Sequence, residues 1–270
     1  MRVFLSGLGK LVGRPASFVS VGLLVGLLGL ILIAAATVQG NGGRGADNAK
    51  ALITFPGAYD LILSFMFGFG GLIAVLYGAA IAGSEWGWGT LKNAVARGES
   101  RARYVLGMFA AIVVAIAVGL ALTLGLGVAI GVLAANVAGI PTAGVTDADT
   151  LNRLPAMAAR GWFAVVEQAS LGFAIATLAR SQLAGIGAGI AFYFGESFAT
   201  LFFPDVVKYL PFAVARASID TGGGQFGGGG GNNPITDPLS PDTALLLVGV
   251  WLVGALLLTV LYTERAEITG

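Results

Sequence analysis

Two glutamates, Glu167 and Glu196, are the residues best placed to do chemistry, because each lies within a long apolar run. A carboxylate is costly against lipid, so both are expected to face the interior of a helix bundle or a water-filled cavity. Counted at 1.5 Å per residue from Arg160 and from Phe203, both lie roughly 10 Å below one membrane surface. Two interpretations stay open. They line a substrate pathway and contact a cationic or polar substrate group, or they are hydrogen-bonded and hold helices together.

The composition argues against most other chemistry. The chain has no cysteine and no histidine, which removes thiol catalysis, a Ser-His hydrolase and nearly all zinc, haem and iron–sulfur sites. No lysine stands in the G-x-x-x-x-G-K-[ST] pattern of a phosphate-binding loop. We therefore expect no catalytic residue, no metal site and no cofactor on this chain, which is not expected to be an enzyme.

A polar, basic interruption runs from Gly83 to Arg103 between two apolar runs. We expect Thr90 to N-cap a short helix from Leu91 to Arg97. Gly98 is expected to end this helix in the left-handed conformation that a Cβ disfavours. Ser100 then caps the long helix that follows.

The short helix is expected to be amphipathic, with apolar residues on one side and polar residues on the other. Held between two spanning helices at the inner membrane surface, such a helix suits docking onto a soluble partner. An ordinary basic loop that only sets topology is the alternative, and these features alone favour it. The apolar stripe comprises Leu91, Ala94 and Val95, and the side chains facing away are Lys92, Asn93 and Arg97.

The order of residues in this segment resembles the region between the second and third helices of export-type ABC transporter permeases, the six-helix membrane subunits of the type-2 family. Gly98 stands where that family often has a proline, and Met108 where it often has a basic residue. The residues that carry the resemblance are Glu85, then Gly89-Thr90-Leu91-Lys92, then Ser100-Arg101, then Tyr104-Val105-Leu106-Gly107.

The resemblance implies a permease subunit of an ATP-driven exporter. ATP and Mg²⁺ would be bound by separate ABC ATPase subunits, and a second permease copy, as a homodimer or with a related chain, would complete the complex. Glu85 is expected to pair with Arg101 or Arg103, or with a basic residue of a partner. The residues expected to couple the chain to the ATPase are Glu85, Gly89, Thr90, Leu91, Lys92, Val95, Arg97 and Arg101.

Composition and hydropathy predict an all-α membrane protein with six transmembrane helices. Hydrophobic residues make up 56% of the chain, charged residues 11%, and the mean hydropathy is +0.87. We also expect an amphipathic segment on the inner leaflet at 1–16, outer loops at 39–55 and 138–160 and a low-complexity segment at 221–241. The resemblance implies in addition that residues 1–270 form one permease domain and that 204–220 form short helices in the outer leaflet. The predicted spans are about 16–38, 56–82, 103–135, 161–178, 182–203 and 243–262.

The basic residues predict the orientation. Nine fall on the side that holds both termini and six on the other, so a multi-pass protein of the plasma membrane with cytoplasmic N- and C-termini is expected. The nine are Arg2, Lys10, Arg14, Lys92, Arg97, Arg101, Arg103, Arg180 and Arg265, and the six are Arg44, Lys50, Arg153, Arg160, Lys208 and Arg216.

Two further classes of function stay open beside the exporter permease. A non-energised six-helix channel or a membrane assembly scaffold explains the composition equally well but not the segment around Glu85. An intramembrane enzyme is weakened by the missing histidine and cysteine. The net charge of +1 argues against a nucleic-acid partner, and the transported substrate does not follow from the sequence.

Overall fold

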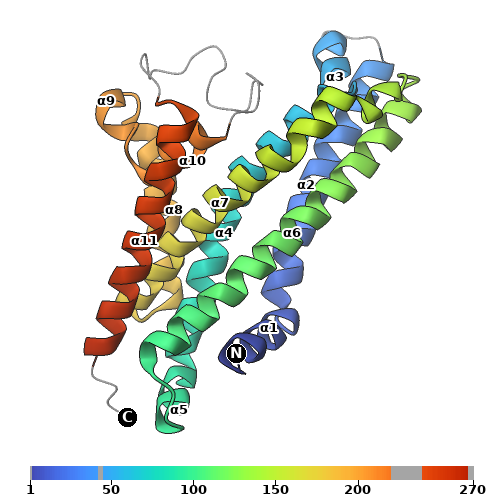
Figure 1. Ribbon diagram of the computed structural model, residues 1–270. Helices are drawn as coiled ribbons and strands as arrows, with labels where there is room; N and C mark the ends of the chain where they lie inside the picture. The colour runs from blue at the N-terminus through green and yellow to red at the C-terminus, as the bar shows by residue number, and fades with distance from the viewer. Residues whose placement is uncertain (1, 42–44, 220–238, 267–270) are drawn as a thin grey trace.

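The regular structure of this chain is helical throughout the part that the computed structural model describes, residues 2–41, 45–219 and 239–266 (Figure 1). Within that part, five helices are long and apolar enough to cross a membrane. The prediction of an all-α, multi-pass membrane protein is therefore confirmed. The five helices are α2 (Pro15–Gly40), α4 (Ala58–Gly87), α6 (Arg101–Val137), α7 (Ala148–Ala179) and α11 (Pro241–Arg265).

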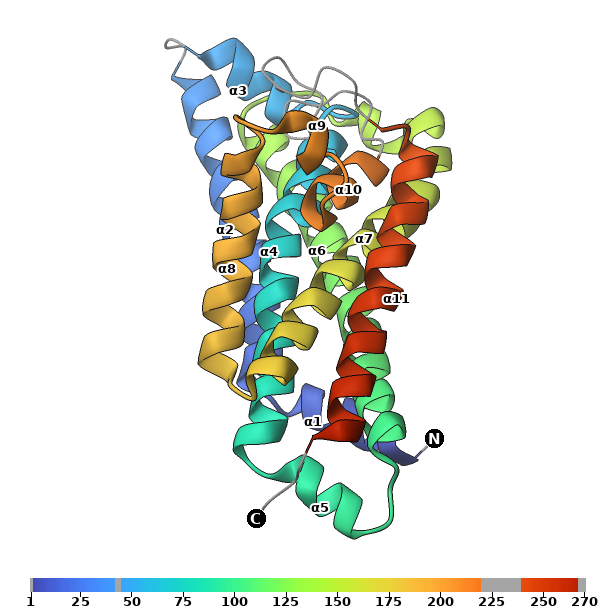
Figure 2. The ribbon, with the colours of Figure 1, turned by 90° about the vertical axis from the view of Figure 1, so that its left-hand side faces the viewer.

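The shorter elements lie at the two ends of the long helices, except for α8, which runs alongside α4 and α7 (Figure 2). α8 covers most of the predicted fifth span, 182–203, but at 18 residues it is not among the five helices that are long and apolar enough to cross a membrane. It follows α7 after the two residues Arg180 and Ser181, so the two helices form a tight hairpin. The shorter elements are α1 (Arg2–Val12), α3 (Ala46–Ile53), α5 (Thr90–Ala96), the 3₁₀ turn η1 (Ala143–Thr146), α8 (Gln182–Ala199), α9 (Pro204–Val207) and α10 (Pro211–Ser218).

The two ends of the bundle carry different elements. Figure 1 shows α1, α5 and the last turn of α11 together at one end, and α3, α9 and α10 at the other. This is the grouping that the predicted topology requires, with the N-terminal segment, the short helix and the end of the last span on one side. The predicted short helices at 204–220 form as α9 and α10, and the glycine-rich segment 221–231 lies outside the described residues.

The centre of the bundle is the contact between α4 and α7, which lie backbone to backbone. A Cβ added to Gly172 of α7 would lie 2.0 Å from the carbonyl oxygen of Val75, and one added to Gly78 of α4 would lie 2.1 Å from that of Ala169. Neither position can hold a side chain, so the two glycines allow the helices to approach this closely. The contact positions the end of α4, where Glu85 lies.

The two segments predicted to be outer loops both contain helix, so the prediction that they are loops is wrong. α7 begins at Ala148 rather than Gly161, since the side chain of Asp147 accepts a hydrogen bond from the Thr150 amide and caps the helix. The first turns of α7 are polar, so hydropathy alone does not identify them as part of the helix. In the other loop α3 forms, because Ile53 is buried against α2 and α6.

The second span also ends later than predicted. α4 continues to Gly87, beyond the expected end at residue 82, because Gly83 packs against the backbone of Gln182 and the helix stays within the bundle. The longer helix places Glu85 in the last turn of α4.

Candidate functional site

The carboxylate of Glu85 is the centre of a buried polar cluster at the end of the bundle that carries α1 and α5. The residue is 5% exposed. Arg14 Nη2 donates to Glu85 Oε1 over 2.8 Å, and Lys10 Nζ lies 3.4 Å from Glu85 Oε2. The hydroxyls of Thr90 and Tyr104 both donate to the same Oε2. Four donors therefore converge on one acid, which satisfies a buried charge that would otherwise be costly.

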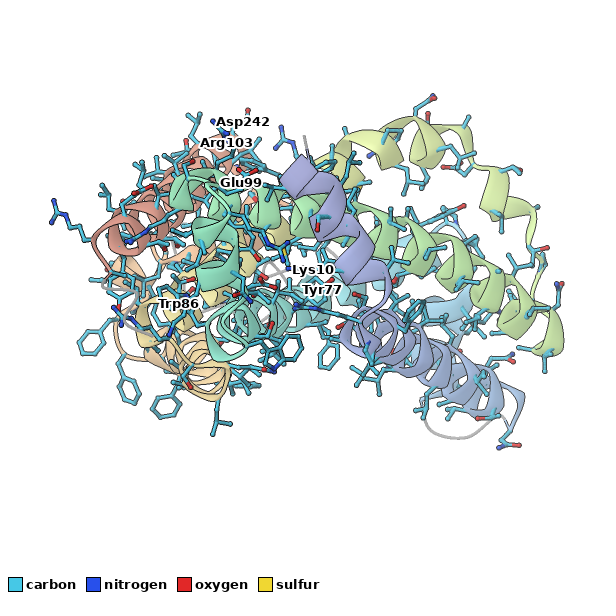
Figure 3. All side chains as sticks on the ribbon, turned by 90° about the horizontal axis from the view of Figure 1, so that it is seen from below. Lys10, Tyr77, Trp86, Glu99, Arg103 and Asp242 are labelled. Carbon is cyan, nitrogen blue, oxygen red and sulfur yellow. The ribbon has the colours of Figure 1, made fainter. Side chains whose placement is uncertain are left out.

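These donors come from four different helices. Lys10 belongs to α1, Arg14 is the residue before α2, Thr90 begins α5 and Tyr104 lies in the first turn of α6. Figure 3 looks onto this end of the bundle and labels Lys10. A movement of α5 at Thr90 is thereby connected, through one carboxylate, to α1, α2, α4 and α6.

Arg14 has more contacts than its ion pair with Glu85. Its Nη1 donates to Ser84 Oγ over 2.8 Å, and the guanidinium lies 5.1 Å from the ring centre of Trp88. The side chain of Arg14 is 14% exposed, whereas that of Lys10 is 35% exposed. Arg14 is therefore the buried partner of Glu85, and Lys10 is the partner that remains in reach of water.

The turn between α4 and α5 brings Thr90 back toward Glu85. Gly89 adopts φ 66° and precedes the first residue of α5, which is Thr90 itself. The prediction that Thr90 is the N-cap is wrong, because its hydroxyl is directed to the carboxylate and the backbone carbonyl of Glu85. The predictions for Gly98, at φ 88°, and for Ser100, whose hydroxyl accepts from the Arg103 amide, are confirmed.

The apolar stripe of α5 packs against this chain rather than facing outward. Leu91 is 3% exposed, and Ala94 and Val95 are half-buried. Leu91 is therefore covered by the rest of the chain and is not available on the outside of α5. Lys92 and Arg97 lie on the exposed side of α5, as predicted.

The two arginines expected to pair with Glu85 lie elsewhere, so that prediction is wrong. Arg101 Nη1 donates to the carbonyl oxygens of Thr263, Glu264 and Ala266, over 2.7–3.2 Å, and so holds the end of α11. Arg103 lies 3.8 Å from Glu99 at the surface. Both point away from Glu85 because the positions nearer to it are filled by Lys10 and Arg14.

Glu196, the second candidate group, holds the start of α10. Its carboxylate accepts from the backbone amides of Phe212 and Ala213 and lies 3.9 Å from Arg216 Nη2. The residue is 2% exposed. The arrangement agrees with the interpretation that Glu196 is hydrogen-bonded and joins helices.

Glu167 has a different environment from Glu196. It is 0% exposed, and in the described part of the chain neither of its carboxyl oxygens has a hydrogen-bond partner. The two glutamates lie on α7 and α8, which pack against each other. Neither lines the groove of about 330 Å³ that lies between α1, α2, α4 and α6.

Residues 44–266 match the model of a family described as a protein of unknown function (DUF2705). The chain belongs to this family. No curated protein matches it. The matched region contains Glu85, Thr90 and Tyr104 but begins after Lys10 and Arg14. Both cations of the cluster therefore come from a segment outside the match.

Sequence reasoning missed the partners of Glu85. Lys10 and Arg14 appear in the sequence only as basic residues of an amphipathic start, and Tyr104 only as part of the pattern after Ser100. The one available signal is that a buried carboxylate needs cationic partners.

Proposed function

We propose that this chain is the membrane-spanning permease subunit of an ATP-driven exporter. α8 serves as a sixth span beside the five long helices. ATP and Mg²⁺ are bound by separate ATPase subunits, and a second permease copy, identical or related, completes the complex. The observation that carries the proposal is the attachment of α5 to Glu85.

That attachment suits the transmission of force from a soluble motor. α5 projects from the bundle end, and its Thr90 hydroxyl donates to the carboxylate that also holds α1, α2 and α6. Buried Leu91 fixes the other side of α5 against the bundle. A push on α5 would move these helices as a unit, which is the kind of displacement that an inward-to-outward switch requires.

The surface offered to an ATPase is the polar side of α5. Lys92 and Arg97 are exposed there, so the partner surface is expected to be acidic. The proposal places this end in the cytoplasm of a plasma-membrane protein. This placement is supported by the position of α1, α5 and the end of α11, which lie together at one end of the bundle. The sequence predicts nine of the fifteen basic residues on that side.

The proposed outer end carries α3, α9 and α10, with α9 and α10 set in the outer leaflet. Glu167 and Glu196 are enclosed in the present conformation, so a substrate pathway past them would open only when α7 and α8 separate. Either residue would contact a substrate only in the conformation in which α7 and α8 are separated.

Co-purification tests the proposal. A tagged chain purified from its native membrane is expected to bring an ATP-hydrolysing subunit, identified by mass spectrometry. The double variant Lys92→Glu/Arg97→Glu should reduce the recovered ATPase at least about tenfold, because like charges then face each other. The control Arg153→Glu reverses an exposed charge at the start of α7, at the opposite end, and should recover as much ATPase as the wild type.

Two outcomes contradict the proposal. If the wild-type chain brings no ATPase, a non-energised channel or an assembly scaffold becomes the better interpretation. If the α5 variant is folded and still recovers a full complement of ATPase, the exposed side of α5 is not the docking surface.

A further inference from the structure

Three acids are buried in the part of the chain that the structure describes, and Glu167 differs from the other two by lacking hydrogen-bond partners. Glu85 accepts from four donors, and Glu196 accepts from two backbone amides. Glu167 is 0% exposed, yet neither carboxyl oxygen accepts or donates a hydrogen bond within the described ranges. It lies on the central helix α7, twelve residues before the helix ends at Ala179.

Among the described residues, no side chain of the helices packed around α7 donates a hydrogen bond to this carboxyl. α7 contacts α4, α6, α8, α10 and α11. On α8 the group whose charge acts on Glu167 is Glu196, which has the same sign, and the nearby Arg216 of α10 is directed to Glu196. The charged groups on α4, α6 and α11 lie toward the helix ends. They are Asp60 and Glu85 on α4, Arg101 and Arg103 on α6, and Asp242, Glu264 and Arg265 on α11.

An unpaired carboxylate enclosed among apolar helices is strongly unfavourable, because its hydration is lost and nothing replaces it. A neutral carboxyl avoids most of that cost. We propose that Glu167 is a proton-binding site, which holds a proton on its carboxyl inside the bundle at neutral pH. The ligand is one H⁺, and the reaction is the reversible transfer of that proton between the carboxyl and water.

Release of the proton requires water to reach Glu167. The helix that follows α7 is α8, which is joined to it by a tight hairpin and packs beside it. When these helices separate, the proton passes from the carboxyl oxygen to water, and the remaining carboxylate becomes hydrated. This inference is independent of the exporter proposal, because it needs neither an ATPase nor transport.

Infrared difference spectroscopy tests the proton directly. The purified full-length protein in lipid bilayers is compared with Glu167→Gln at neutral pH. The expected wild-type-minus-variant spectrum contains the carbonyl stretch of one protonated carboxylic acid. The two carboxylate stretches in its place would overturn the proposal.

Two further samples make this result specific. Glu196→Gln is the matched control, another buried glutamate on the neighbouring helix, and its own spectrum should retain the protonated band of Glu167. If Glu167→Gln does not fold, Glu167→Leu replaces it, because an apolar side chain also removes the carboxyl without leaving a charge. A protonated band that survives undiminished in the folded Gln or Leu variant would come entirely from another acid and would also overturn the proposal.

Discussion

Arg14 Nη2 lies 2.8 Å from Glu85 Oε1, which joins the start of α2 to the last turn of α4. The two side chains are 14% and 6% exposed, so this is a largely buried ion pair. Such a pair adds little stability compared with apolar residues of similar shape, but the loss of one partner leaves the other buried and uncompensated. The pair therefore has its main effect on which helices are held together.

Replacing Glu85 by Gln is expected to lower the free energy of unfolding by about 2–3 kcal/mol, because Arg14 keeps its charge and loses its anion. Arg14→Gln should cost a similar amount. The double variant should cost less than the two together, with a coupling energy of about 1–3 kcal/mol. Thermal or denaturant unfolding of the purified protein in detergent measures all three values.

The control for this cycle is Arg103→Gln. Arg103 lies 3.8 Å from Glu99 and its side chain is 74% exposed, so its loss should change stability by less than about 0.5 kcal/mol. Strictly additive effects of Glu85→Gln and Arg14→Gln would show that the two residues do not interact.

Replacing Glu196 by Ala is expected to loosen α10. The amides of Phe212 and Ala213 lose their acceptor, and loss of such a cap costs about 0.5–2 kcal/mol. Hydrogen exchange measured by mass spectrometry should become faster over residues 209–218. Asp205→Ala removes an exposed carboxylate from the neighbouring α9 and should leave that exchange unchanged. Unaltered protection of α10 in Glu196→Ala would refute the capping role.

Single cysteines give a map of the membrane topology, because the natural chain has none. Asn93 on α5 and Asn152 near the start of α7 are both exposed and lie at opposite ends. An impermeant thiol reagent on intact cells should label Asn152→Cys but not Asn93→Cys, and permeabilised cells should show both. The reverse pattern would invert the proposed orientation.

The first turn of α7 is expected to depend on pH. The Thr150 hydroxyl and the Thr150 backbone amide donate to Asp147 Oδ2 over 2.6 and 2.9 Å, and these bonds lower the pKa of Asp147 below its ordinary value. A lowered pKa means that the cap is fully present above the ordinary pKa of an aspartate and is lost as the pH falls through the lowered value.

Amide exchange over residues 148–154, corrected for intrinsic rates, should therefore accelerate in acid. Asp147→Asn keeps an oxygen acceptor but does not titrate, so its corrected exchange should be independent of pH. The same acid dependence in both proteins would assign the effect to another group.

The sequence alone was enough to predict the features that depend on neighbouring residues. Long apolar runs predicted the helices of a multi-pass membrane protein. Gly98 predicted a left-handed turn, and Ser100 predicted the cap of α6. Each of these rests on the conformational preference or hydration of a few adjacent residues. The start of α7 was missed for the same reason, since its first turns are polar although the helix is continuous.

The tertiary structure alone decided which charges meet. Glu85 binds Arg14, 71 residues away, rather than Arg101, and Arg101 instead holds carbonyl groups more than 160 residues away. Glu167 and Glu196 look alike in the sequence, yet one is unpartnered and the other caps a helix. The partners of a buried charge depend on which helices pack beside it, and that packing is decided by close contacts such as Gly78 and Gly172 across the whole bundle.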